Sequence, residues 1–285
     1  DSAHVEVGTD GRARLWTTLP AIGQGTATTF AQQLADEMSL PLSAVTVERP
    51  DTAVGGLHGT GTFASRSAIS GGGAIHLAVE ALLAEATELA AGRLGEAAES
   101  LTYEAGLFTG AGGREVSLGE LAAASHDGVL SASGRFDPPV PSYPYATHAC
   151  EVAIDLETGA IELLRYVIVE DCGTVLNPLI VEGQVHGATT QGIGGTLYEE
   201  LVYNEDGQLI TGSLMDYLVP TATEIPRFEV DHLETPAPDQ VLGAKGVGEG
   251  GTLAPPAAIA NAVSAALGRE YNRLPIRPAD VLETV

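Results

Sequence analysis

A lysine and a glutamate lie four residues apart in a glycine-rich segment, Gly243-Ala-Lys-Gly-Val-Gly-Glu-Gly-Gly-Thr252. Lys245 is the only lysine in the 285 residues. The Ala-rich stretch from Leu253 to Leu267 has apolar residues at helical spacing and two prolines in its first turn, which predicts a helix. Glu249 therefore precedes a helix N-terminus, where backbone N–H groups and the helix dipole favour an anion. A carboxylate presented among glycines is suited to general-base work.

Three further polar, glycine-rich segments have the chemistry of a cofactor site. They are Gly23-Gln24-Gly25, Ala64-Ser65-Arg66-Ser67 and Gln191-Gly192-Ile193-Gly194. The glycines let backbone N–H groups approach a ligand, and the two glutamines offer amides that bind oxo groups or a heterocycle edge. Ser65, Arg66 and Ser67 add hydroxyls and a guanidinium suited to phosphate. Any one such loop is more often a plain turn, so only the combination indicates a site for a polyanionic heterocyclic cofactor.

The segment Gly246-x-Gly-x-x-Gly251 also matches the dinucleotide-binding fingerprint. A proline-rich stretch, Pro236-Ala-Pro-Asp-Gln240, stands where a β-strand should lead into that turn. A glutamate inside the turn would also repel a pyrophosphate. We therefore reject the nicotinamide interpretation.

The composition limits the partners. Thirty-eight acidic residues against 13 basic ones give a net charge of −25, which argues against nucleic acid and anionic membranes as partners. Cys150 and Cys172 are the only cysteines and have no Cys-x-x-Cys spacing, so we expect no metal ligands from this chain. No apolar run approaches the roughly 20 residues of a membrane span, and no signal peptide is visible. We expect a cytoplasmic location.

The hydrophobic pattern predicts an α+β fold of mixed β-sheets with packed helices. Residues 3–18 alternate as two strands, followed by a helix to about Met38, a short strand at 42–48, a loop from Gly55 to Ser67 and a helix ending near Gly92. Residues 101–143 indicate short strands and turns. Further on we expect a hairpin at 149–170, a helix at 181–199, a second hairpin turning at 204–207 and the last helix. Two subdomains, of about 1–145 and 146–285, are expected.

Five phrases in this order resemble the xanthine dehydrogenase/aldehyde oxidase family, specifically the C-terminal part of its molybdenum-binding large subunit. They are Gly23-Gln-Gly25, Thr60-Gly-Thr-Phe-Ala-Ser-Arg-Ser67, Asp171-Cys-Gly-Thr-Val-Leu-Asn-Pro178, Gly183-Gln-Val-His-Gly-Ala-Thr-Thr-Gln-Gly-Ile-Gly194 and Gly243-Ala-Lys-Gly-Val-Gly-Glu249. The resemblance spans nearly all of the chain. It implies the fold of the second molybdenum-cofactor-binding domain, and it implies that the N-terminal part of the family's large subunit is absent from this sequence.

The resemblance also implies roles for individual residues. Glu249 would be the base that takes a proton from a Mo–OH group, whose oxygen attacks an electrophilic carbon while hydride passes to Mo=S. The metal would be held by the pterin dithiolene, without a protein ligand. Molybdopterin, as its cytosine dinucleotide, would lie against Gln24, Gly25, Thr26, Ala64, Ser65, Arg66, Ser67, Gln191, Gly192, Lys245, Gly246, Val247 and Gly248. Lys245 would either tune Glu249 or hold the loop through carbonyl oxygens; the two alternatives stay open.

The same resemblance implies partners. The remainder of the molybdenum subunit, a 2Fe-2S subunit and an FAD subunit would complete the enzyme, which would act on an aldehyde or an N-heterocycle. A carbon monoxide dehydrogenase is an alternative, because the substrate-discriminating half is not in this sequence. A scaffold or interaction subunit that kept the loops without turnover is the alternative from a different functional class.

Overall fold

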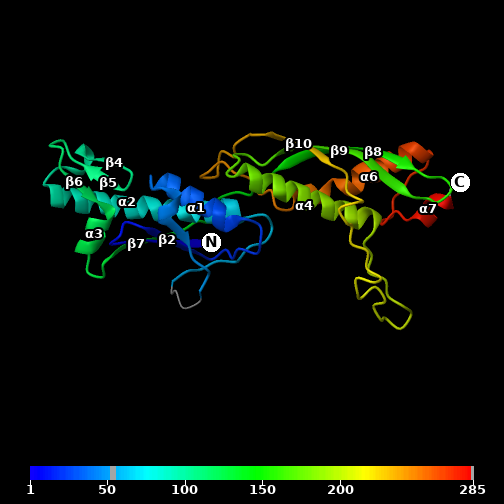
Figure 1. Cartoon of the computed structure of the whole chain (residues 1–285), viewed down its shortest axis with the longest axis horizontal. Helices are drawn as coiled ribbons and strands as arrows, with labels where there is room; N and C mark the ends of the chain where they lie inside the picture. The colour runs from blue at the N-terminus through cyan, green and yellow to red at the C-terminus, as the bar shows by residue number, and fades with distance from the viewer. Residues whose placement is uncertain (52–55, 284–285) are drawn as a thin grey trace. The chain divides into compact units, whose positions relative to one another are not determined.

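The computed structural model describes residues 1–51 and 56–283. The chain forms two compact units (Figure 1). Unit 1 contains Asp1–Ser142 and Pro236–Gly246, and unit 2 contains Tyr143–Thr235 and Val247–Val285. The α+β prediction is confirmed, since both units combine β-sheets with packed helices.

Unit 1 is built on a four-stranded sheet in the order β3-β2-β1-β7. β1 (Ser2–Gly8) and β2 (Ala13–Thr17) form the predicted antiparallel pair, joined by a tight turn. β7 (Val129–Arg135) pairs antiparallel with β1, whereas the short β3 (Val45–Val47) runs parallel to β2. A single 3-10 turn, Leu42–Ala44, replaces the first half of the strand expected at 42–48.

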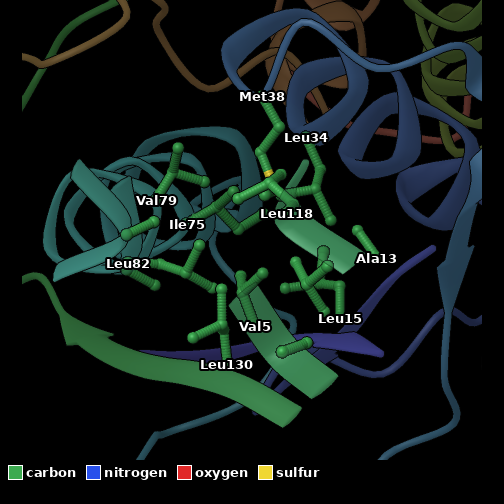
Figure 2. Close-up of a cluster of buried hydrophobic side chains, with 14 of the residues drawn as sticks. Val5, Ala13, Leu15, Leu34, Met38, Ile75, Val79, Leu82, Leu118 and Leu130 are labelled. Carbon is green, nitrogen blue, oxygen red and sulfur yellow. The ribbon is translucent and has the colours of Figure 1, made fainter. Parts of the chain in front are cut away.

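Two helices supply the apolar side chains that cover this sheet. α1 (Thr26–Glu37) follows the first glycine-rich loop, and α2 (Gly72–Leu94) follows the second after a π-helical turn, Ser67–Gly71. Figure 2 shows Leu34 of α1 and Ile75, Val79 and Leu82 of α2 meeting residues from the strands. Complete burial of a Leu or Ile side chain contributes about 1.5–3 kcal/mol, so this cluster holds both helices against the sheet. The loop that precedes α2 was expected to begin at Gly55, which lies outside the described residues.

The helix that contains α2 is long and apolar enough to be a candidate membrane span, although we expected no such segment. The 28 residues Ser67–Leu94 have a window of mean hydropathy 1.3 and pass the length and composition test for a span. Of that window, 56% is buried inside the protein, because α2 packs against β1 and β7. A core helix has this pattern.

Residues 101–143 contain more regular structure than expected. β4 (Thr102–Glu104), β5 (Leu107–Thr109) and β6 (Glu115–Ser117) form a small antiparallel sheet. A helix that we did not predict, α3 (Leu118–Ala124), follows directly. Its signal is present in the sequence: Ser117 accepts a hydrogen bond from the Glu120 backbone N–H and the Glu120 carboxylate accepts one from Ser117 N–H, which is a capping box.

Unit 2 has a three-stranded sheet in the order β10-β9-β8. β8 (Tyr145–Ile154) and β9 (Ile161–Asp171) are the predicted hairpin. α4 (Pro178–Leu197) is the predicted glycine-containing helix, and α5 (Gly250–Leu253), α6 (Pro255–Leu267) and α7 (Pro278–Leu282) follow near the end of the chain. The helix expected from Leu253 therefore begins at Pro255, after the separate turn of α5.

Two features of unit 2 differ from the sequence prediction. β10 (Phe228–Leu233) was missed, although it alternates and pairs in parallel with β9. The hairpin expected around residues 204–207 is reduced to a turn, with a single bridge between Tyr203 and Leu209.

Gly134 of β7 provides a test of the packing of α2. A Cβ at this position would lie 2.2 Å from the Ala74 carbonyl oxygen and 2.5 Å from the Ala78 nitrogen. Gly134→Ala should lower the free energy of unfolding by about 1–3 kcal/mol, because backbone cannot move aside as a flexible side chain can. Urea unfolding followed by circular dichroism measures this change.

Gly92→Ala is the matched control, because Gly92 lies in α2, the helix that packs against Gly134. A Cβ at Gly92 would meet nothing within 4 Å. This substitution should leave stability unchanged or raise it by up to about 1 kcal/mol, since alanine is the better helix former. Equal effects at the two glycines would contradict the close approach of α2 to β7.

Candidate functional site

The predicted site residues belong to both units. Unit 1 contains the segments 23–26 and 64–67 together with Lys245 and Gly246, and unit 2 contains Gln191, Gly192 and Val247–Glu249. Lys245 and Glu249 are thus close in sequence but belong to different compact units.

The start of α1 has the features of an anion site. Gly25 precedes the helix with φ 81° and ψ 8°, a left-handed conformation that glycine adopts at no steric cost, and no side chain caps the first turn. Thr26 Oγ1 is buried and has no hydrogen-bond partner among the described residues. The neighbouring Gln24 amide is held by its own loop, since its Oε1 accepts from Ile22 N–H at 2.7 Å. First-turn N–H groups and a buried hydroxyl fit a phosphate oxygen.

The second loop has a strained backbone. Ala64 and Ser65 are consecutive non-glycine residues with positive φ, 52° and 54°. Such residues cost on the order of 1 kcal/mol each and are enriched at functional sites. Ser67 begins the π-helical turn that leads into α2, another geometry frequent at functional sites.

Within unit 1 the structure brings the second loop to the Lys245 segment. A Cβ on Gly246 would lie 2.3 Å from the Ser65 carbonyl oxygen, so only glycine allows this approach. Lys245 beside it is buried, with 8% of its surface exposed. Two of the glycine-rich segments singled out from the sequence therefore meet backbone to backbone.

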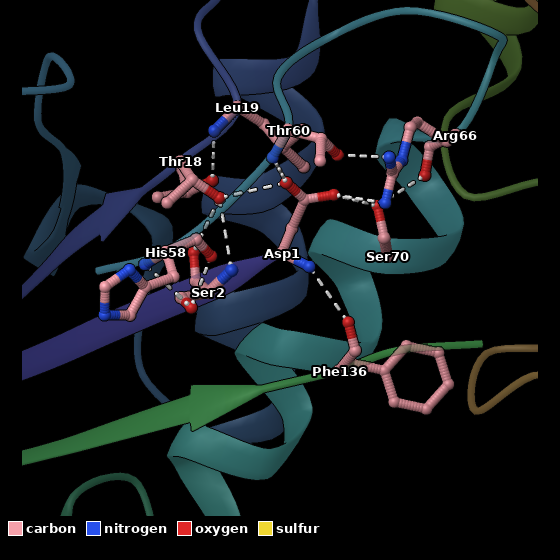
Figure 3. A network of polar contacts seen from close by, with 10 residues as sticks. Asp1, Ser2, Thr18, Leu19, His58, Thr60, Arg66, Ser70 and Phe136 are labelled. Atoms are coloured by element: carbon pink, nitrogen blue, oxygen red, sulfur yellow. Dashed lines mark hydrogen bonds and ion pairs between the residues drawn. The ribbon is translucent and has the colours of Figure 1, made fainter. Parts of the chain in front are cut away.

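Arg66 stands at the start of the π-helical turn and is held there by protein groups, while its role toward a phosphate stays a prediction. Its guanidinium forms an ion pair with Asp1 at 2.9 Å and donates to Thr60 Oγ1 (Figure 3). Sequence reasoning missed Asp1 entirely, since no pattern connects it with a loop some sixty residues away. The guanidinium holds the loop together from the protein side.

In unit 2 the residues near Glu249 pack on α4. Glu249 is exposed and immediately precedes α5. A Cβ on Gly251 would lie 3.0 Å from the Val185 carbonyl oxygen, and Thr252 Oγ1 donates to the Ala188 carbonyl oxygen at 3.1 Å. These contacts fix the direction in which the chain leaves Glu249.

The remaining predicted residues of unit 2 have mixed surroundings. Gly192 is buried, and a Cβ there would lie 2.8 Å from the Thr252 carbonyl oxygen. Gln191 is exposed on α4. Val247 packs against the core of unit 2, whereas Gly248 is half-buried. Gly192 thus acts in packing, and Gln191 has its amide on the surface of the unit.

A second group of titratable residues lies in the core of unit 2. Glu170 is 5% exposed, and burial, reinforced by the neighbouring Asp171 charge, raises its pKa from 4.5 to about 7. Its Oε1 lies 3.6 Å from Nδ1 of His232, which pairs with it across the parallel strands. Asp171 accepts hydrogen bonds from Gly173 N–H, Thr235 N–H and the Tyr145 hydroxyl. Tyr166, Ile168 and Glu170 alternate along β9 and share its buried face. The acid on this apolar face was a sequence signal for the group that we did not use.

No group of three or more His, Cys, Asp or Glu side chains among residues 1–51 and 56–283 has a metal-binding arrangement. Burial raises the pKa of the Cys172 thiol to about 11, which disfavours the thiolate needed for metal ligation. The donors of unit 1 are backbone N–H groups and hydroxyls. These suit an organic group with anionic oxygens.

Comparison with known proteins agrees with this chemistry. Residues 1–226 match the family model described as the molybdopterin cofactor-binding domain. The nicotine 6-hydroxylase large subunit of Paenarthrobacter nicotinovorans is 35% identical over 99% of this chain and 36% of its own length. The carbon monoxide dehydrogenase large chain of Hydrogenophaga pseudoflava is 35% identical over 87% of this chain and 32% of its own length.

Solved structures share the fold over the whole chain. Quinoline 2-oxidoreductase from Pseudomonas putida 86 has a TM-score of 0.90 with 37% identity, and the match covers 100% of this chain and 38% of that one. A Cu,Mo-CO dehydrogenase also has a TM-score of 0.90, with 32% identity over 99% of this chain and 37% of that one. The chain thus spans less than two-fifths of the length of these relatives.

The raised pKa of Glu170 predicts how stability depends on pH. The folded protein keeps the Glu170 proton up to about pH 7, whereas the unfolded chain loses it near 4.5, so stability falls as pH rises between these values. In Glu170→Gln the side chain at position 170 is an amide, which does not titrate. The free energy of unfolding of this variant, relative to wild type, should therefore increase by roughly 1–2 kcal/mol from pH 4.5 to pH 8, after allowance for solvent screening.

Chemical denaturation at a series of pH values measures this difference. Glu162→Gln is the control, because Glu162 is exposed on the same strand β9. Parallel curves for wild type and Glu170→Gln would contradict the pKa assigned to Glu170.

The contact between Gly246 and Ser65 can be tested with a lysine-specific protease. Since Lys245 is the only lysine, such a protease cuts this chain at one bond, next to Gly246. Gly246→Ala should force the segment away from the Ser65 carbonyl oxygen and speed cleavage by about tenfold or more, as expected for overpacking of at least 1.4 kcal/mol. Gly250→Ala should cleave at the wild-type rate, because a Cβ there meets nothing within 4 Å.

Proposed function

Because the chain belongs to the molybdopterin cofactor-binding domain family of large subunits, we propose that it forms part of the catalytic subunit of a molybdenum hydroxylase. The observation that supports this most directly is the meeting of Ser65 with Gly246. This contact joins two of the predicted cofactor segments within unit 1, and Ser65 is one of the two residues with a strained backbone.

In this proposal unit 1 binds the cofactor's pterin and phosphates. The N–H groups at the start of α1 and the buried Thr26 hydroxyl are donors for anionic oxygens. The turn from Ala64 to Ser67 adds a hydroxyl and backbone groups. We propose the cytosine dinucleotide form of the cofactor, whose extra phosphate and base would occupy further donors of the same kind.

The cofactor would supply an oxygen atom to an electrophilic substrate carbon and take up two electrons. Glu249 would accept the proton released at this step on its carboxylate. Its position before α5 supports this role, because the flanking glycines leave the carboxylate accessible and the packing of Gly251 on α4 fixes the backbone beyond it. Gln191, exposed on α4, would offer its amide to the ligand.

We further propose an aldehyde or an N-heterocycle as substrate, since relatives are named for nicotine hydroxylation, quinoline oxidation and aldehyde oxidation. The remainder of the molybdenum subunit would complete the pocket. Separate 2Fe-2S and FAD subunits would carry the electrons away. The cytoplasm is the proposed location of the complex.

Glu249→Gln tests the proposed base. The amide keeps the shape of the side chain but cannot accept the proton, so turnover should fall by about a hundredfold or more while the cofactor stays bound. The measurements are steady-state rates of the purified complex, its molybdenum content by elemental analysis and the nucleotide released on denaturation.

Glu205→Gln is the control, since Glu205 is exposed in a turn of the same unit. Near-normal rates for Glu249→Gln would refute the role of Glu249. A wild-type complex without molybdenum or cytosine nucleotide would instead refute the enzyme proposal and favour a scaffold subunit.

A further inference from the structure

Asp1 is fixed at the start of the sheet of unit 1. Its backbone exchanges two hydrogen bonds with Phe136: the Asp1 nitrogen donates to the Phe136 carbonyl oxygen at 3.0 Å, and Phe136 N–H donates to the Asp1 carbonyl oxygen at 3.0 Å. The Asp1 side chain is completely buried. Its carboxylate therefore has a fixed place relative to the strands.

Four groups surround this carboxylate (Figure 3). Oδ1 accepts from Thr60 N–H and Thr18 Oγ1, both at 3.1 Å, and Oδ2 accepts from Ser70 Oγ at 2.7 Å and pairs with the Arg66 guanidinium at 2.9 Å. A buried carboxylate that lost one of these donors would keep its desolvation penalty. The four contacts are therefore expected to form together.

These contacts join both ends of the second glycine-rich loop. Thr60 lies near its beginning, Arg66 at its end, and Ser70 in the π-helical turn that continues into α2. The Arg66 guanidinium also donates to Thr60 Oγ1, which closes the loop across its base. Between these two points lie Ala64 and Ser65 with their positive φ angles.

The neighbouring residue Ser2 holds the same loop. Ser2 Oγ donates to the His58 carbonyl oxygen at 2.7 Å and accepts from His58 N–H at 3.2 Å. A Cβ on Gly59 would lie 2.1 Å from Thr18 Oγ1, so the loop lies directly on the strand ends. The first two residues of the chain thus hold the loop from His58 to Arg66 against the sheet.

We propose that Asp1 is a positioning residue of the cofactor site: its buried carboxylate holds Arg66 and Thr60 so that Ala64 and Ser65 keep their left-handed conformation for anion binding. This inference rests on the proposed function for the identity of the ligand. Arg66 then acts as a clamp between carboxylate and loop, and the direct donors to the cofactor's phosphates come from backbone and hydroxyl groups.

Asp1→Asn is the principal test, in the complete enzyme complex and in the same protein prepared without cofactor. The carboxamide replaces one acceptor oxygen by a donor, which would face a donor already present. Hydrogen exchange followed by mass spectrometry should show amides of residues 58–66 exchanging about tenfold faster or more in the cofactor-free protein. The purified complex should also retain less cytosine nucleotide than the wild-type complex.

Three further variants keep the test decisive. Asp127→Asn is the matched control, because the Asp127 side chain is 81% exposed in the same unit, and it should change neither readout. Arg66→Gln removes the other half of the ion pair and should reproduce the effect on exchange. The double variant should add little to either single change, since both break one unit of structure.

The outcomes separate the two proposals. Wild-type exchange at residues 58–66 in both Asp1→Asn and Arg66→Gln would overturn the role of Asp1, even if the cofactor is bound. If Asp1→Asn does not fold, Arg66→Gln alone decides in the same way. Faster exchange with full nucleotide retention would overturn the link to the cofactor, and a wild-type complex without cofactor would overturn the proposed function itself.

Discussion

The loop from His58 to Arg66 is held on one side by a buried carboxylate and touched on the other by a glycine. Asp1 receives donors from both ends of the loop, and Gly246 approaches the Ser65 carbonyl oxygen so closely that any Cβ would collide with it. Left-handed residues at Ala64 and Ser65 are unfavourable in an unrestrained chain. Restraint from two directions explains how they persist, and the conformation of the candidate site depends on it.

Much of the fold was predictable where a pattern is local. The β1–β2 and β8–β9 hairpins and helices α1, α2 and α4 follow from periodicity and turn residues. α3 and β10 also carry local signals, a capping box at Ser117 and alternation in Phe228–Leu233, that we did not use. Those misses come from short length, because an element of six or seven residues offers few repeats of its period.

The site was less predictable because its contacts are not local. Glycine spacing identified the segments, and the meeting of Ser65 with Gly246 agrees with their grouping. The partner of Arg66 could not be found, since an isolated acid at position 1 has no pattern that connects it to the loop. Nor could sequence proximity show that Lys245 and Glu249 fall into different compact units. The roles of Glu249 and Lys245 in catalysis stay predictions.

Buried acids in the two units differ in their number of hydrogen-bond donors. Asp1 and Asp171 are each surrounded by several N–H or O–H groups, an arrangement that stabilises a carboxylate. Glu170 Oε1 has no hydrogen-bond partner among the described residues, and burial, reinforced by the Asp171 charge, raises the pKa of Glu170 to about 7. Adjacent positions on β9 thus hold Asp171, whose carboxylate accepts several hydrogen bonds, and Glu170, whose Oε1 accepts none from the described residues.

The assignment of residues 236–246 to unit 1 has a consequence for how this region can be inherited and engineered. The polypeptide leaves unit 1 after Ser142, returns at Pro236 and leaves again after Gly246. After recombination with one crossover near residue 142, residues 1–142 would come from one parent and residues 236–246 from the other. Leu242 and Gly246 of the second parent would then have to fit Gly72 and Ser65 of the first. Chimeras between relatives should therefore exchange residues 1–142 and 236–246 together, as one discontinuous module.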